Sequence, residues 1–168
     1  MKILQVKGTS IYSGDQKIHL KGVNYGNWML LEHYMIGMFW VDYKMRQEFK
    51  NALGEARYKA FFDKYMEYYL EEKDFEFIKS CGMNLVKIPF SYRHFENDMR
   101  PGEYLEEGFM YLDKVINFCR KYDMYMMPVI FSTPGSQARD PNAESAFGEV
   151  LFWDNQQTRT ESFLFGGL

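Results

Sequence analysis

Two short apolar segments on either side of one amphipathic helix constrain the fold more than any other feature of this sequence. Residues 84–90 form a mostly apolar run that contains Pro89, and residues 124–131 form a second run that ends before a Ser-Thr-Pro-Gly turn. Such runs are typical of buried parallel strands. Residues 109–122 between them repeat apolar side chains at helical spacing. The pattern predicts a βαβ unit in a parallel sheet, whose strands carry functional residues at their carboxyl ends.

The rest of the chain extends this alternation of strands and helices. A turn cluster at residues 13–16 separates two β-prone runs and predicts a hairpin. Apolar spacing at three- and four-residue steps is strongest at residues 54–70, which predicts a long helix. Gly82 is placed to end a second helix in a left-handed turn. The further predicted elements are strands at 2–6, 10–12, 17–20 and 23–25, and helices at 28–36, 72–81 and 158–165.

Length and composition exclude several classes of protein. The chain has 168 residues, whereas a complete (β/α)8 barrel typically needs about 250. Its 20 Lys and Arg oppose 23 Asp and Glu, so we expect no nucleic-acid partner. No apolar run could span a membrane, and no signal-peptide core is visible at the start, which favours the cytoplasm. We expect no cofactor, because metal clusters, phosphate-binding glycine loops and nucleophilic triads are missing from the sequence.

The two cysteines, Cys81 and Cys119, each lie in an apolar helix-like segment. Neither is near a histidine or the other cysteine in the sequence. We therefore expect two reduced thiols that pack against apolar neighbours, with a disulfide or a metal-binding pair as the alternative.

Several motifs, in consistent order along nearly the whole chain, resemble those of one known family. Residues 22–32 read Gly-Val-Asn-Tyr-Gly-Asn-Trp-Met-Leu-Leu-Glu, and residues 82–95 read Gly-Met-Asn-Leu-Val-Lys-Ile-Pro-Phe-Ser-Tyr-Arg-His-Phe. The other matching segments are the start of the second βα unit at Asp74-Phe75, residues 112–116, the Pro-Gly-Ser-Gln of 134–137, Phe152-Trp153, and Gln157 with Arg159. Together they resemble glycoside hydrolase family five, the family of cellulases and exo-glucanases.

The resemblance implies an α/β fold, namely the N-terminal part of a TIM (β/α)8 barrel preceded by a short β-hairpin. Residues 1–20 would form the hairpin, and residues 21–168 the first three βα units of an incomplete catalytic domain. The family cleaves β-glycosidic bonds with retention, using two glutamates about 5–5.5 Å apart. Family members place these glutamates after strands four and seven. Neither matches a residue here, so we expect no catalytic residue and no activity from this chain alone.

The resemblance also suggests residues that contact a sugar. Glu32 matches a carboxylate that binds the sugar at the reaction subsite, the alternative being a solvated helix residue. Lys87 replaces an arginine that holds the nucleophile, and it lacks the planar fork of that arginine. Phe131 replaces a histidine, and would stack on a sugar or fill the core. Gln137 would bond a sugar hydroxyl or cap its loop, and Ala138 replaces an asparagine.

Aromatic and acidic residues in the same loops are weaker candidates. Tyr92 and Trp153 are suited to stacking on pyranose faces, with core packing as the alternative. His94 is expected to be structural. The acids of these loops, which are Glu96, Asp98, Asp140 and Glu144, are expected to be solvated and not to form a working catalytic pair.

Two functions therefore compete. One is a retaining glycosidase of carbohydrate catabolism that acts on β-linked oligo- or polysaccharides. The alternative is a truncated or decayed, non-catalytic module that binds sugar or a partner, as the residues at positions 87, 131 and 138 suggest. A third possibility is a half-barrel that associates with another chain, because an open parallel sheet exposes its edges.

Overall fold

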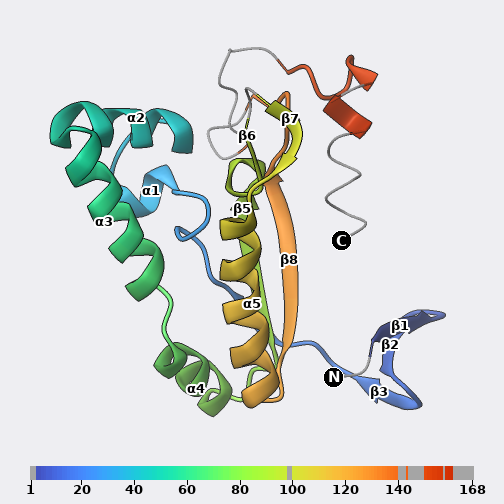
Figure 1. Ribbon diagram of the computed structural model, residues 1–168. Helices are drawn as coiled ribbons and strands as arrows, with labels where there is room; N and C mark the ends of the chain where they lie inside the picture. Colours follow the sequence, from blue (N-terminus) through green and yellow to red (C-terminus); the bar gives the residue numbers. More distant parts are fainter. Residues whose placement is uncertain (1–2, 98–99, 140–142, 144–149, 157, 161–168) are drawn as a thin grey trace.

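The computed structural model describes residues 3–97, 100–139, 143, 150–156 and 158–160 (Figure 1). Strands and helices alternate from Gly22 to Ser132, as the sequence predicts. The predicted helix at 158–165 falls partly outside the described residues, and residues 158–160 are helical.

The first strands form a small antiparallel sheet of their own. Strand β1 (Leu4–Lys7) pairs with β2 (Ser10–Ser13), which pairs with β3 (Gln16–Ile18). The predicted hairpin is confirmed, and β1 adds a third strand to it. Gly14 has a φ of 64°, the left-handed conformation that the tight β2–β3 turn requires. Figure 1 shows this sheet set apart from the helices.

A three-stranded parallel sheet forms the centre of the molecule. Its strands are β4 (Gly22–Asn24), β5 (Leu85–Ser91) and β8 (Tyr125–Ser132), in the order β4-β5-β8. The register pairs Asn24 with Lys87, and Lys87 with Met127. The predicted βαβ arrangement is confirmed. The described residues form an open sheet and not a closed barrel.

Between β4 and β8 the described residues form the helices α1 (His33–Ile36), α2 (Asp42–Leu53), α3 (Glu55–Tyr68), α4 (Glu72–Ser80) and α5 (Glu106–Lys121). Helices α3, α4 and α5 agree with the sequence prediction. Helix α2 was not predicted, because its sequence is mostly polar and only Asp42 and Met45 are buried. Between β5 and α5 lie a short turn of helix, η1 (Tyr92–His94), and a hairpin of β6 (Glu96–Asn97) and β7 (Arg100–Tyr104).

The predicted helix at 28–36 is wrong over its first half. Trp28, Met29, Leu30 and Leu31 are buried, and none of them is helical. The Trp28 indole donates a hydrogen bond to the Met66 carbonyl (3.1 Å). Met29 forms a bridge with Phe90 at the edge of the sheet. Insertion of this segment between α3 and β5 outweighs its local helical spacing, so helix α1 has only four residues.

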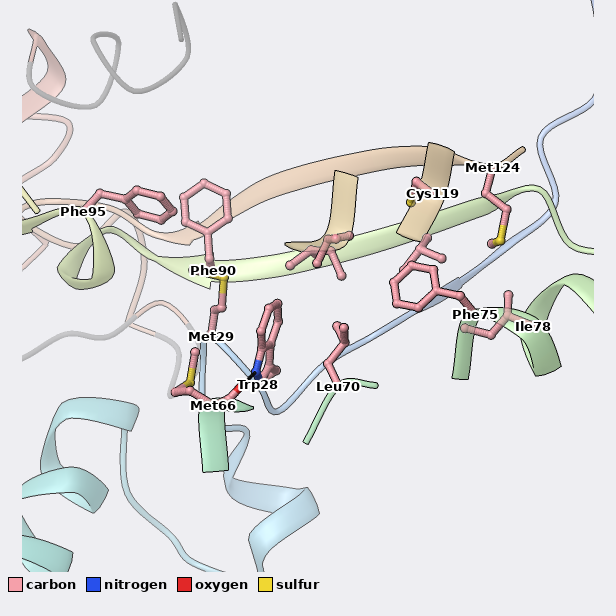
Figure 2. Packing of buried hydrophobic residues seen from close by; sticks show 13 residues of the cluster. Trp28, Met29, Met66, Leu70, Phe75, Ile78, Phe90, Phe95, Cys119 and Met124 are labelled. Carbon is pink, nitrogen blue, oxygen red and sulfur yellow. Dashed lines mark hydrogen bonds between the residues drawn. The ribbon is translucent and has the colours of Figure 1, made fainter. Parts of the chain in front are cut away.

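The core lies between one face of the sheet and the helices (Figure 2). Alternate residues of β5, which are Val86, Ile88 and Phe90, point into it. Figure 2 shows Trp28 and Met29 beside Phe90 at one end of the cluster. Phe75, Ile78, Cys119 and Met124 pack at the other end.

The cysteines differ from each other more than expected. Both are free thiols in the structure. Cys119 is fully buried, and burial raises the pKa of its thiol to about 11. Cys81 is exposed at the end of α4, so the prediction that it packs in the core is wrong.

Two phenylalanines of α4 provide a matched test of this core. Phe75 is fully buried, whereas Phe77 is 68% exposed. We expect Phe75→Ala to lower the free energy of unfolding by about 3–5 kcal/mol, because it removes apolar contact and leaves a cavity. Phe77→Ala should change it by less than about 0.5 kcal/mol. Urea denaturation followed by circular dichroism measures both, and equal effects would contradict the placement of α4.

Candidate functional site

The loops that follow the three parallel strands meet at one edge of the sheet. Residues 25–32 follow β4, residues 92–95 follow β5, and residues 133–137 follow β8. Parallel alignment brings these carboxyl ends together, which is the edge where α/β proteins place their ligands. The candidates for sugar contact are Glu32, Lys87, Tyr92, Phe131, Gln137 and Trp153. All six come from these loops, from the strands that precede them, or from the segment after residue 150.

Glu32 is a buried carboxylate and not a solvated helix residue. It is 5% exposed and precedes α1 as its N-cap. Its backbone N–H donates to Asn27 Oδ1 (2.9 Å). A Cβ atom on Gly26 would lie 2.2 Å from Glu32 Oε1. The absence of a side chain at Gly26 therefore makes room for this carboxylate beside the end of β4.

Lys87 and Phe131 contact each other. Lys87 pairs with Met127 in the sheet. Phe131 lies four residues beyond Met127 along β8, which corresponds to about 13 Å. The Lys87 Nζ nevertheless lies 5.2 Å from the centre of the Phe131 ring. The lysine stem therefore runs along β5 towards the carboxyl end, and places its ammonium over the aromatic face.

Gln137 braces the loop that follows β8. Its Oε1 accepts hydrogen bonds from the Thr133 N–H (3.2 Å) and Oγ1 (2.9 Å). Its Nε2 donates to the Phe131 carbonyl (2.5 Å). Both lone pairs of the amide oxygen are thus occupied, which matches the expected alternative of a loop cap.

Trp153 presents an oriented aromatic surface. The residue is 60% exposed, and its Nε1 donates to the Gln137 carbonyl (2.7 Å). Arg159 donates to the Trp153 carbonyl (2.7 Å), and Phe152 meets the indole edge-on at 4.8 Å. These contacts fix the ring while leaving much of it open to solvent.

Four of the six candidates therefore form one connected series of contacts, which is Lys87, Phe131, Gln137 and Trp153. For Tyr92, stacking on a sugar and packing in the core were both open. It is 6% exposed, and the Arg93 guanidinium lies 5.0 Å from its ring centre. Its neighbour Phe95 is 2% exposed in the core. Burial favours packing over sugar stacking as the role of Tyr92.

His94 is structural, as expected. Its ring meets Tyr111 edge-on at 6.5 Å, and its carbonyl lies so close to Gly108 that a Cβ there would clash at 2.2 Å. Burial, reinforced by the nearby positive charge of Arg46, lowers the pKa of His94 to about 3. The imidazole is therefore neutral at physiological pH.

The loop acids differ in how they are placed. Glu96 is 4% exposed, and its Oε1 accepts the Gly102 N–H (2.8 Å). It holds the β6–β7 hairpin and is not the solvated acid that the sequence suggested. Asp98, Asp140 and Glu144 lie outside the described residues. Within the described ranges, neither a cluster able to hold a metal ion nor a helix able to cross a membrane is found.

Sequence analysis missed two residues that shape this edge, the buried Asp42 and the partly buried Arg46. Asp42 is 2% exposed and accepts the Leu31 N–H (2.8 Å), while Arg46 Nε donates to both of its carboxylate oxygens (3.0 Å each). The i, i+4 spacing of an acid and a base was the available signal, although that spacing is usual on exposed helix faces as well.

Comparison with known proteins relates the chain to glycoside hydrolases. It is 34% identical over 157 residues to a beta-xylosidase of Phanerodontia chrysosporium, across 93% of this chain and 33% of that protein. It is 31% identical over 104 residues to endoglucanase C of Acetivibrio thermocellus, across 62% of this chain and 29% of that protein. A glucan 1,3-beta-glucosidase of Pichia angusta is 28% identical over 153 residues, 86% of this chain and 33% of the relative. No family model matches the chain.

Solved structures show the same fold. The structure titled AoRut superposes with a TM-score of 0.65 at 21% identity, covering 86% of this chain and 41% of that one. A rutinosidase from Aspergillus niger gives a TM-score of 0.63 at 17% identity, covering 84% and 40%. The chain thus spans about a third of the length of the curated relatives it matches.

The depressed pKa of His94 generates a pH-dependent stability. The unfolded chain binds a proton at this residue near pH 6.5, whereas the folded chain does not do so until about pH 3. Acidification therefore favours the unfolded state. We expect His94 to contribute a loss of about 2 kcal/mol in unfolding free energy between pH 7 and pH 5.

Urea denaturation at pH 7 and pH 5 measures this loss, and His94→Gln should remove it. The exposed His19 gives a matched control as His19→Gln. An NMR titration of His94 with a midpoint near 6.5 would contradict the buried, neutral imidazole.

Proposed function

We propose that this chain is the amino-terminal portion of a family-five (β/α)8 glycoside hydrolase domain. Residues 1–20 would form a small accessory sheet, and residues 21–168 the first three βα units. The order β4-β5-β8 supports this proposal, because consecutive parallel strands that lie side by side are what a barrel uses. The names of the relatives and the shared fold add support.

We propose a β-linked glucan as the ligand, bound at the carboxyl edge of the sheet. The series of contacts from Lys87 through Phe131 and Gln137 to Trp153 is the observation that carries this proposal. It joins a cation, two aromatic rings and an amide. An exposed, oriented indole suits the flat apolar face of a pyranose. In the same proposal, the Glu32 carboxylate accepts hydrogen bonds from sugar hydroxyls.

In this proposal the chain supplies part of the sugar-binding wall and none of the catalytic carboxylates. Retention requires a nucleophile and an acid about 5–5.5 Å apart. Glu96, the described acid that follows β5, is instead held by the Gly102 N–H inside a hairpin. The two catalytic glutamates of the family that this sequence resembles have no match among its residues.

A non-catalytic sugar-binding module is the second candidate, and the Lys87–Phe131 contact favours it. An ammonium over a phenyl ring offers neither the bidentate fork of arginine nor the hydrogen-bonding nitrogens of histidine. Sugar binding without turnover by any longer form of the protein would select this candidate.

The proposed ligand can be tested through Trp153. We expect the chain to bind cellotetraose, and Trp153→Ala to weaken that binding about three- to tenfold, because stacking is lost. Trp153→Phe should retain most of the affinity, since it keeps an aromatic face. Isothermal titration calorimetry measures the affinities, and Phe77→Ala on α4 is a matched exposed-aromatic control. Equal affinity of Trp153→Ala and the unmodified chain would contradict the site.

Turnover provides a separate test of the missing catalytic pair. We expect no release of reducing sugar from cellotetraose by the purified chain, because neither catalytic glutamate of the family that it resembles has a match in this sequence. Hydrolysis that persists through purification and disappears in Glu96→Gln would contradict this expectation. Reducing-end assay with mass spectrometry of the products measures the outcome.

A further inference from the structure

We propose that Asn27 and Tyr65 are positioning residues. They link the turn before Glu32 to helix α3 and thereby fix the position of the Glu32 carboxylate. The inference rests on the proposed function, in which Glu32 contacts the sugar. It concerns two residues that touch no candidate ligand themselves and act through the backbone around Glu32.

Asn27 connects the two ends of this arrangement. It is a non-glycine residue with a φ of 59°, and it is only 7% exposed. Its Oδ1 accepts the Glu32 N–H (2.9 Å), and its Nδ2 donates to the Tyr65 hydroxyl (3.1 Å). A left-handed backbone is unfavourable for most residues but tolerated by asparagine, whose short side chain can bond locally. Here both ends of the amide are used.

Tyr65 anchors the turn to α3. Its hydroxyl donates to the Asn27 carbonyl while it accepts from Asn27 Nδ2, so the two residues are joined twice. The ring is held by Phe61, Phe62 and Tyr69, with ring centres 6.1, 5.7 and 4.9 Å away. Burial raises the pKa of Tyr65, which keeps the hydroxyl protonated as a donor.

A second anchor lies one residue further along both segments. The Trp28 indole donates to the Met66 carbonyl (3.1 Å). Consecutive residues of α3 thus hold consecutive residues of the turn. These bonds tie the turn to a helix of 14 residues, whereas α1 beside Glu32 has only four.

Gly26 completes the arrangement on the other side of the carboxylate. A Cβ there would lie 2.2 Å from Glu32 Oε1 and 3.0 Å from Cδ. Gly26 therefore permits the position, and Asn27 fixes the Glu32 backbone from which the side chain extends. We infer that the turn, and not α1, determines where Glu32 meets a ligand.

The test replaces Asn27 by glycine. Asn27→Gly keeps the left-handed backbone accessible but removes the acceptor of the Glu32 N–H and the link to Tyr65. We expect amide hydrogen exchange at Glu32 to accelerate about three- to tenfold, as the loss of one hydrogen bond predicts. We expect a similar loss of affinity for cellotetraose. Tyr65→Phe should weaken cellotetraose binding less than Asn27→Gly does.

Matched controls separate positioning from general destabilisation. Asp123 has a φ of 49° at the far end of α5, so Asp123→Gly makes the same backbone change away from Glu32. Tyr68 is 60% exposed on α3, so Tyr68→Phe removes a hydroxyl remote from the turn. Both controls should leave Glu32 exchange and cellotetraose affinity unchanged.

The outcomes distinguish this inference from the proposed function. Unchanged Glu32 exchange in Asn27→Gly overturns the positioning role. Faster exchange with unchanged affinity also overturns it, provided that Glu32→Gln weakens binding, and the proposed function then stands. If Glu32→Gln binds cellotetraose as well as the unmodified chain, the sugar-binding role of Glu32 fails and the inference fails with it.

Discussion

The structure depends on the two faces of the central strand β5. Val86, Ile88 and Phe90 enter the core on one side, where removal of apolar surface from water is the main stabilising term. Lys87 lies on the opposite side and runs towards the carboxyl end. Because side chains alternate along a strand, one short segment both anchors the helices and supplies the candidate site. A shift of one residue in its register would exchange these roles.

The carboxyl edge is assembled by two kinds of support. After β8, the side-chain amide of Gln137 closes its own loop, and the main-chain carbonyl of Gln137 accepts the indole N–H of Trp153. After β4, support comes from another element, since Tyr65 and Met66 of α3 bind the turn that contains Asn27. Local sequence defines the first support, and tertiary packing defines the second.

The sequence predicted the elements whose local pattern agrees with their final environment. The strands at β5 and β8 and the helices α3, α4 and α5 all show apolar periodicity that matches the face they bury. The segment from Trp28 to Leu31 has helical spacing but is pulled into the core by contacts far away in the chain. Helix α2 carries few apolar residues, so periodicity gives it little signal.

The site shows the same limit of prediction. The resemblance pointed to Glu32 as a candidate. It gave no reason why a carboxylate fits there, because the space depends on the glycine at position 26, which has no side chain. For Tyr92 the sequence left sugar stacking and core packing open, because an aromatic residue in a loop is compatible with either, and the residue is buried. Residue type alone does not separate a stacking ring from a packing ring.

The contact between Lys87 and Phe131 joins two positions at which the sequence differs from the family that it resembles. Taken one at a time, these positions hold a lysine and a phenylalanine where the family that the sequence resembles has an arginine and a histidine. In three dimensions the two replacements adjoin, and each supplies the other with a neighbour: the ring accommodates the ammonium, and the ammonium covers the ring. Residues in contact are commonly coupled, so we expect a substitution at either position alone to change the surroundings of the other residue.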